Sequence, residues 1–400
     1  MSKLRIGYIC DQYLPRTSTD TQQIVSMISA FGLNDTDVTL VAPTKNRKKE
    51  LTGKELADYY GVLETYELSK QKTSFYIFRG LDKLLFAIKL ALKYKNSDTF
   101  DVIYSRNLPV VLAFLLFTKL PVVFETYRNW PDQNTGCIPF FRYMKDKKQF
   151  LGIITHSKFA CNSYKNIGIS ADKILVSHNG IWPNRFLENH SVSGARKKLG
   201  INNKGIIATY AGRVNKDKGL EIVLELARHF PDITFWIVGS EQQGDIESDS
   251  GNIDNVTVFP WQPVQQVPLY LAASDLLIIP PSAKPLHKVG NTVLPMKTFG
   301  YMASQKPILA PRIPDIQEVI THNNNAILVK PDDFGSFKEN FQKLIDDPKL
   351  RNKIAERAFN DVIDLSWEKR AQQIKKFILE RMGNRESIAD KTADIQQSAV

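Results

Sequence analysis

The chain has 400 residues, of which 43% are hydrophobic and 24% are charged, as is usual for a soluble globular protein. Because one hydrophobic core rarely serves so long a chain, we expect two domains. The formal net charge of +11 suits anionic partners, but no motif for DNA or RNA recognition accompanies it, so we predict no nucleic-acid partner.

The three cysteines, Cys10, Cys137 and Cys161, are widely scattered. Their spacing gives neither a disulfide framework nor a metal-ligand pattern, so we predict no metal site. No apolar run approaches the ~20 residues that span a bilayer. We therefore expect a cytoplasmic protein.

In chain order, short apolar runs alternate with helix-length segments. The first half predicts strands at 3–10, 38–42, 74–78, 102–105, 122–125 and 153–155, and the second half at 206–210, 234–238, 256–259, 276–279, 308–310 and 326–329. Alternating strands and helices predict parallel sheets covered by helices on both faces. Two such blocks predict an α/β protein of two doubly wound, Rossmann-like domains that face each other across a cleft.

We place the domain boundary in the Pro-, Ser- and Gly-containing stretch after Asn179-Gly180, with domains at 1–185 and 186–365. Residues 366–382 have helical spacing, and Ser366 is a suitable N-cap. Residues 383–400 are polar and weakly patterned, which predicts a flexible tail.

Two strand–loop–helix segments of the second half contain residues suited to binding an anion. In the first, Gly212-Arg213 and Lys218-Gly219 follow the strand at 206–210. Free N–H groups and the helix dipole attract an anion at such a helix start, and an arginine and a lysine both suit a diphosphate. The simpler interpretation is a pair of solvated loop charges, but the buried strand and Gly212 favour an anion site.

In the second segment, 295–303, Pro295 opens a helix whose first turn holds Met296, Lys297 and Thr298. Its free backbone N–H groups would bind phosphate oxygens. Together the two segments predict the handling of a nucleotide-diphosphate leaving group.

With these motifs, the chain resembles the retaining glycosyltransferases of family 4, which have the GT-B fold. Five further segments agree with the family in order, namely 101–107, 153–157, 173–180, 256–259 and 267–275. The resemblance implies that the C-terminal domain binds a nucleotide sugar, and that the N-terminal domain binds a glycan or lipid-linked acceptor of polysaccharide, lipopolysaccharide or capsule synthesis. It also implies a last helix, 366–382, that crosses back to the N-terminal domain, and a reaction that needs no metal or other cofactor.

Residue by residue, the resemblance makes Arg213 and Lys218 the catalytic cations. The other predicted site residues are Gly212, Met296, Lys297, Thr298, Gly300 and His287 for the donor, and Arg16, Thr17, Glu125 and Tyr127 on the acceptor side or in the cleft.

The chain departs from the family at three places. The usual acidic pair would fall at Thr292 and Gly300, a frequent histidine is replaced by Tyr127, and the first loop lacks glycines. A divergent enzyme that holds its donor by other groups is one interpretation. A catalytically silent GT-B subunit that binds a partner is the other.

Residues 83–95 form a lysine-rich helix in which Phe86 and Leu90 lie among Lys83, Lys89 and Lys93. Cations interleaved with large apolar groups suit an anionic membrane surface, so we consider attachment to the inner face of the membrane. Residues 142–148, beside Phe140 and Phe141, repeat the pattern. The alternative is that a neighbouring helix covers Phe86 and Leu90.

Overall fold

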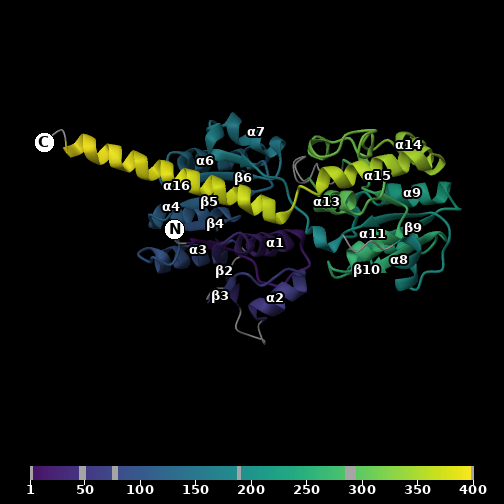
Figure 1. Ribbon diagram of the computed structural model, residues 1–400, viewed down its shortest axis with the longest axis horizontal. Helices are drawn as coiled ribbons and strands as arrows, with labels where there is room; N and C mark the ends of the chain where they lie inside the picture. The colour runs from purple at the N-terminus through teal and green to yellow at the C-terminus, as the bar shows by residue number, and fades with distance from the viewer. Residues whose placement is uncertain (1–2, 45–50, 74–79, 187–190, 284–293, 398–400) are drawn as a thin grey trace. The chain divides into compact units, whose positions relative to one another are not determined.

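The computed structural model describes residues 3–44, 51–73, 80–186, 191–283 and 294–397. The chain forms two compact units (Figure 1), one of Met1–His178 with Trp367–Val400 and one of Asn179–Ser366. The first unit therefore ends ahead of the boundary that we placed at 185/186. It also includes the last helix.

The first unit is built on seven parallel strands in the order β3-β2-β1-β4-β5-β6-β7. β3 was not predicted, because its sequence Glu-Leu-Ser-Lys-Gln-Lys is polar, as edge strands often are. The strand predicted at 74–78 lies outside the described residues. The strands are β1 (Leu4–Ile9), β2 (Thr36–Thr44), β3 (Glu67–Lys72), β4 (Val102–Ser105), β5 (Val122–Thr126), β6 (Phe150–Thr155) and β7 (Ile174–Val176).

Helices cover this sheet, and α4 is apolar on all sides because it is largely enclosed by its neighbours. A capping box between Thr52 and Glu55 starts α2, and Gly61 in the left-handed conformation ends it. The helices are α1 (Thr19–Leu33), α2 (Gly53–Tyr60), α3 (Leu81–Tyr94), α4 (Leu108–Phe117), α5 (Trp130–Gln133), α6 (Ile138–Lys145), α7 (Lys158–Asn166) and α16 (Trp367–Gln397), with 3-10 turns η1 (Thr135–Cys137) and η2 (Ala171–Lys173).

The lysine-rich helix α3 packs into the core of this unit. Phe86 and Leu90 are buried in the cluster that contains Phe114 of α4, so the alternative of a covering helix is confirmed. The predicted mixed apolar and cationic face is therefore wrong for these two residues. Phe141 is likewise fully buried, which weakens the case for membrane contact by the second segment, residues 142–148. No helix in the described ranges is long and apolar enough to cross a membrane.

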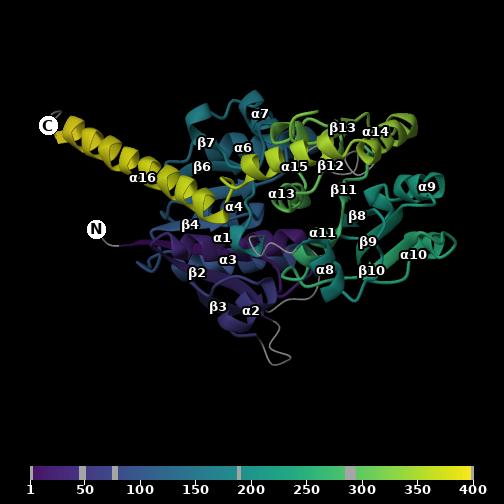
Figure 2. The same ribbon diagram turned by 45° about the vertical axis from the view of Figure 1, so that its right-hand side comes forward.

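The last helix, α16, lies beside α1 and β6 within the first unit (Figures 1 and 2). Trp367, Ile374 and Ile378 bury its apolar face. The helix does not end at 382, as predicted, but continues to Gln397. Glutamate, arginine, alanine and glutamine in this stretch have high helix propensity, which a polar composition alone does not reveal.

The second unit has six parallel strands in the order β10-β9-β8-β11-β12-β13. All six strands predicted for the second half are present within one or two residues of their predicted bounds. The order reverses at β8 and β11, so the carboxyl ends of these two strands form the crevice where doubly wound sheets bind ligands. The strands are β8 (Ile207–Ala211), β9 (Thr234–Ser240), β10 (Val256–Pro260), β11 (Leu276–Ile278), β12 (Ile308–Pro311) and β13 (Ile327–Val329).

Two apolar clusters, one on each face of this sheet, hold its helices. One contains side chains of α8, α11, α13 and α15, and the other contains side chains of α9, α10 and α14. The bounds are α8 (Val192–Lys198), α9 (Glu221–His229), α10 (Asp245–Ser250), α11 (Val267–Ala273), α13 (Met296–Ala303), α14 (Phe334–Asp346) and α15 (Pro348–Val362), with η3 (Pro183–Arg185), η4 (Lys216–Lys218) and η5 (Ile316–Glu318).

Candidate functional site

Gly212 stands directly after β8, at the crevice of the second unit. Its φ is +152°, and a Cβ at this position would lie 2.5 Å from Nζ of Lys297 and 3.2 Å from the hydroxyl of Tyr210. Any side chain here would displace the lysine. A glycine is therefore needed so that the first turn of α13 can approach the end of β8.

Lys297, on that first turn, lies against an aromatic face. Its Nζ is 3.5 Å from the centroid of the Tyr210 ring. Burial, and then the neighbouring charge of Lys218, lower the pKa of Lys297 well below its usual value. The charged form of Lys297 is costly without an anion nearby and would be stabilised by one, so the position suits a phosphate ligand.

Lys218 and Arg213 bring further positive charge to the same place. Desolvation and the charge of Arg213 lower the pKa of Lys218. The hydroxyl of Tyr210 donates to the carbonyl of Arg213 at 2.7 Å, which fixes the loop. Gly219, at φ +67°, approaches Ser282 so closely that no side chain fits there. The structure thus brings three of the predicted cations together.

The start of α13 supplies backbone donors. Pro295 is the N-cap, and first-turn N–H groups have no partner within a helix. The N–H of Thr298, however, donates to the carbonyl of Pro295 at 3.0 Å, and the Thr298 side chain is fully buried. Met296 and Lys297 are therefore the better backbone donors. The backbone N–H of Ala211 donates to the Tyr301 hydroxyl at 2.6 Å and ties α13 to β8.

Gly300 lies on the second turn of α13. A Cβ built there would lie 3.6 Å from the Phe186 ring, an ordinary contact, so an alanine fits without a clash. The absence of the glutamate that the family resemblance leads us to expect is therefore a chemical departure, and no clash at Cβ requires it. Two other positions, His287 and Thr292, lie outside the described residues.

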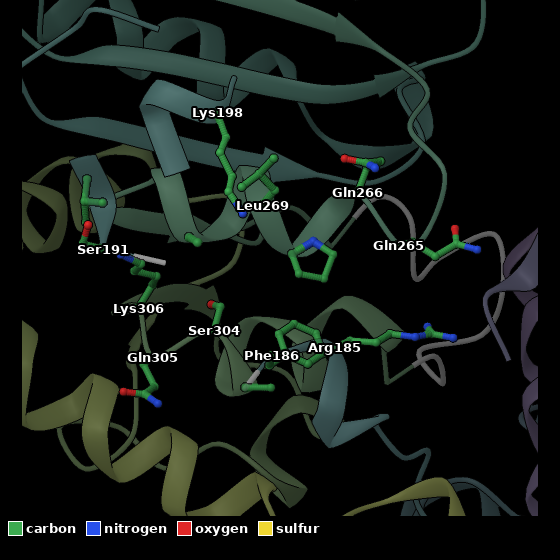
Figure 3. A pocket seen from close by; sticks show the side chains of 14 residues that line it. Arg185, Phe186, Ser191, Lys198, Gln265, Gln266, Leu269, Ser304, Gln305 and Lys306 are labelled. Carbon is green, nitrogen blue, oxygen red and sulfur yellow. The ribbon is translucent and has the colours of Figure 1, made fainter. Parts of the chain in front are cut away.

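A separate cavity of about 520 Å³ lies at the other end of α13 (Figure 3). No predicted donor residue is among those that line it. Its described lining is cationic and polar over an apolar base, with Arg185, Phe186, Ser191, Val192, Lys198, Gln265, Gln266, Pro268, Leu269, Ala272, Ala303, Ser304, Gln305 and Lys306.

Asp315, after β12, is a buried carboxyl group that lies in no motif of the sequence. It is 1% exposed. Burial, and then the charge of Glu318, raise the pKa of Asp315 to about 7, although the backbone N–H of Leu294 acts in the opposite direction. Asp315 therefore titrates near neutral pH.

In the first unit, Glu125 ends β5 in an internal network. Its Oε1 accepts from Nη2 of Arg370 at 2.8 Å and lies 2.6 Å from Nε2 of His156. Burial opposes ionisation, but Arg370, His156 and Arg106 together hold the pKa of Glu125 well below its usual value. Glu125 is 2% exposed, so its place on the acceptor side or in the cleft stays a prediction, and its carboxylate does not reach the surface. Its carboxylate is committed to Arg370.

The sequence did not predict that Arg370 and His156 are the partners of Glu125. Arg370 also donates to the carbonyl of His178 at 3.0 Å, at the point where the chain leaves the first unit. It lies three residues after Trp367 and four before Ile374, on the buried face of α16. An arginine on the apolar face of a predicted helix is the sequence signal that could have identified Arg370 as a buried, paired residue. Burial lowers the pKa of His156 to about 4, so this histidine is neutral.

Tyr127 follows Glu125 and is only partly buried. The guanidinium carbons of Arg106 and Arg128 lie 5.4 Å and 5.5 Å from its ring centroid. Arg106 directly follows the predicted strand 102–105 and Arg128 lies three residues after the predicted strand 122–125, so their place at a carboxyl edge could have been expected. Arg16 and Thr17 lie on an exposed loop, where the Tyr60 hydroxyl accepts from the backbone N–H of Arg16 at 2.8 Å.

Among the residues that the structure describes, no group of three or more His, Cys, Asp or Glu side chains is arranged to hold a metal ion.

The second unit is similar to known proteins. Residues 193–361 match the family model described as "Glycosyl transferases group 1". The match is confined to the second unit and covers less than half of the chain. The cations around Gly212 and the start of α13 lie within this matched segment.

Curated relatives are similar to part of this chain. An alpha-D-kanosaminyltransferase of Streptomyces kanamyceticus is 26% identical over 171 residues, which are 41% of this chain and 42% of that protein. The lipopolysaccharide core biosynthesis glycosyltransferase LpsE of Rhizobium meliloti (strain 1021) is 24% identical over 172 residues, 42% of this chain and 48% of that protein. The chain thus spans less than half the length of these two relatives.

The crystal structure of HepE of Anabaena in complex with UDP resembles the whole chain. It covers 94% of this chain and 100% of that chain, with a TM-score of 0.73 at 16% identity. With the two parallel sheets, this likeness confirms the predicted GT-B fold.

Proposed function

We propose that the protein transfers a sugar from a nucleotide-diphosphate donor to a glycan or lipid-linked acceptor, with retention of configuration and without a metal ion. The observation that carries this proposal is the group of three cations, Arg213, Lys218 and Lys297, around Gly212. The relatives named as glycosyltransferases, and the UDP bound by HepE, support the donor class.

In the proposed mechanism, negative charge grows on the diphosphate as the bond to the sugar breaks. Fixed cations and the N–H groups of Met296 and Lys297 stabilise that charge more in the transition state than in the ground state. The departing phosphate accepts the proton of the acceptor hydroxyl, so no carboxylate base is required. Loss of one such donor typically lowers kcat about 10²–10³-fold, or roughly 3–4 kcal/mol.

Calorimetric titration with UDP and GDP, followed by assays of donor hydrolysis and transfer, tests this function. We expect one nucleotide to bind, and we expect Arg213→Ala to abolish turnover. Turnover near that of the wild type in Arg213→Ala would contradict the role of this residue.

A catalytically silent GT-B subunit is the second candidate, and Gly300 in place of the usual glutamate favours it. Absence of binding with every nucleotide sugar would support this candidate. Since a Cβ at Gly300 meets no clash, Gly300→Glu can be compared directly. A large gain in transfer rate would indicate a site that has lost activity.

For the cellular setting, we propose the cytoplasmic side of a membrane, where lipid-linked acceptors would be presented. An anionic membrane surface as partner is supported by the net charge of +11, and not by Phe86 and Leu90, which are buried. Flotation with anionic liposomes tests it. Unchanged flotation after Lys83, Lys89 and Lys93 are replaced by glutamine would exclude helix α3 from this contact.

A further inference from the structure

The first unit holds a second group of cations, which neither the donor site nor the buried network explains. Arg106, Tyr127 and Arg128, here called the Tyr127 cluster, are all partly buried. The guanidinium carbons of Arg106 and Arg128 lie 5.4 Å and 5.5 Å from the centroid of the Tyr127 ring. The distance between the two carbons is therefore no greater than the sum of these two values. Nε of Arg128 donates to the Tyr127 hydroxyl at 3.3 Å, which leaves the proton of that hydroxyl for another acceptor.

Neither guanidinium forms an ion pair with a carboxylate of the described residues. Nη2 of Arg106 is buried without a hydrogen-bond partner, while Nη1 donates to the backbone carbonyl of Asp20 at 3.2 Å. Arg128 stacks on Trp130, with 5.0 Å from its guanidinium carbon to the ring. Both arginines therefore keep hydrogen-bond donors that a ligand could use.

The carboxylates that act on Arg106, those of Glu125 and Asp20, have other partners, as has Asp11. Glu125 is paired with Arg370, and Asp11 lies 2.8 Å from Nζ of Lys83. Asp20 accepts from the side-chain amide of Gln12. Glu125 and Asp20 favour the charged form of Arg106, but they leave the two guanidinium groups without direct neutralisation.

The backbone presents the cluster rigidly at the edge where ligands bind. Arg106 follows β4, whose carboxyl end adjoins that of β1 where the strand order reverses. The Arg128 N–H donates to the Thr126 hydroxyl at 3.0 Å, and the Tyr164 hydroxyl donates to the Arg128 carbonyl at 2.7 Å. The two arginines are therefore held before any ligand arrives, which lowers the entropic cost of binding.

We propose that the Tyr127 cluster binds an anionic phosphate or diphosphate group on the acceptor, so that this protein glycosylates a phosphorylated acceptor. This inference rests on the proposed function, because the protein has an acceptor only if it transfers a sugar. Two guanidinium groups and a phenol hydroxyl supply the positive charge and the hydrogen-bond donors that phosphate oxygens accept. The acceptor is favoured over the donor because Arg213, Lys218 and Lys297 already supply the donor cations in the other unit.

The first experiment measures anion binding without any glycosyl transfer. Inorganic pyrophosphate is titrated into the full-length Arg213→Ala/Lys218→Ala variant, in which the donor site is weakened. Adding Arg128→Gln should weaken the remaining binding at least tenfold, whereas Arg128→Lys should weaken it less. Lys147→Gln is the control, because Lys147 lies 4.1 Å from the Tyr143 ring as a cation–aromatic pair outside the cluster. Equal pyrophosphate affinity with and without Arg128→Gln would overturn the proposal.

The second experiment compares matched acceptors that carry the same sugar, linked through a diphosphate to a short polyprenyl chain or directly to an uncharged alkyl chain. We expect transfer to the charged acceptor to be preferred, and Arg128→Gln to raise its KM at least tenfold. The KM of the donor and the slow hydrolysis of donor without acceptor should not change. Equal use of both acceptors, or an equal loss of donor hydrolysis, would contradict the assignment.

A competition arm identifies the source of the phosphate. If a free sugar 1-phosphate inhibits transfer and Arg128→Gln removes that inhibition, the phosphate alone is recognised. If only the polyprenyl diphosphate competes, the lipid-linked form is recognised. Failure of every nucleotide diphosphate to bind the wild type would refute the proposed function, but the pyrophosphate titration would still decide on the cluster.

Discussion

Nη2 of Arg370 lies 2.8 Å from Oε1 of Glu125, and both side chains are 2% exposed. The two residues are 245 positions apart, and their contact fastens the start of α16 to the end of β5. Arg370 also donates to the carbonyl of His178. One guanidinium thus holds the segment that leaves the first unit, the segment that returns to it, and a strand of its sheet.

Removal of Arg370 should strongly destabilise the first unit. Arg370→Met leaves Glu125 buried without its main partner, and breaking a buried ion pair in this way costs about 3–5 kcal/mol. Chemical denaturation followed by circular dichroism and intrinsic tryptophan fluorescence measures this loss. Lys376→Ala, which breaks an exposed pair with Glu380 at 3.9 Å, is the control and should change stability by at most about 0.5 kcal/mol. Equal effects of the two substitutions would contradict the structural role of Arg370.

Binding of UDP or GDP should be accompanied by proton uptake at Lys297. Its pKa is low in the free protein because of burial and Lys218, and a bound diphosphate would raise it. Affinity should therefore increase as the pH falls toward the lowered pKa. Calorimetry in buffers of different ionisation enthalpy measures the protons taken up. In Lys297→Met the uptake should fall, while in Lys330→Met, an exposed lysine, it should not. Undiminished uptake in Lys297→Met would assign the proton to another group.

Gly212→Ala should weaken nucleotide binding. The new Cβ would lie 2.5 Å from Nζ of Lys297, and a residue other than glycine at φ +152° is strained, at about 1–3 kcal/mol. Gly300→Ala is the matched control, since its Cβ would have a neighbour only at 3.6 Å. Titration with UDP or GDP, together with thermal unfolding, separates loss of binding from loss of stability. Unaltered affinity in Gly212→Ala would show that the glycine is not required for the site.

Asp315→Asn should stabilise the second unit more at pH 8 than at pH 5. Because burial raises the pKa of Asp315 to about 7, the native state favours the protonated form, and its contribution to stability is lost as the pH rises from about 4 to 7. Asparagine does not titrate, so the gain at pH 8 should exceed that at pH 5 by about 2–3 kcal/mol. Denaturation at both pH values measures this difference. The exposed Asp254→Asn serves as control, and the same pH dependence in that variant would refute the explanation.

The strands of the second unit could be predicted because each is a short, apolar, buried run between turn-forming residues. The strand–loop–helix geometry at Gly212 and Pro295 could be predicted for a related reason, while anion binding there stays a prediction. Their chemistry is local, since one loop and one helix start supply the donors. By contrast, β3 was missed because an edge strand need not be apolar, and the end of α16 because propensity there exceeds any hydrophobic signal.

The alternation of strands and helices and the parallel sheets could be derived from the sequence, because both depend on hydrophobic period and local backbone chemistry. The pairing of Glu125 with Arg370, the place of Lys297 over Tyr210 and the contacts of Arg106 and Arg128 with Tyr127 became visible only in the folded chain. These residues come together because of the order of the strands in the sheet and because the last helix packs on the first unit. Neither of these two features can be recognised from a regular spacing of residues in the sequence.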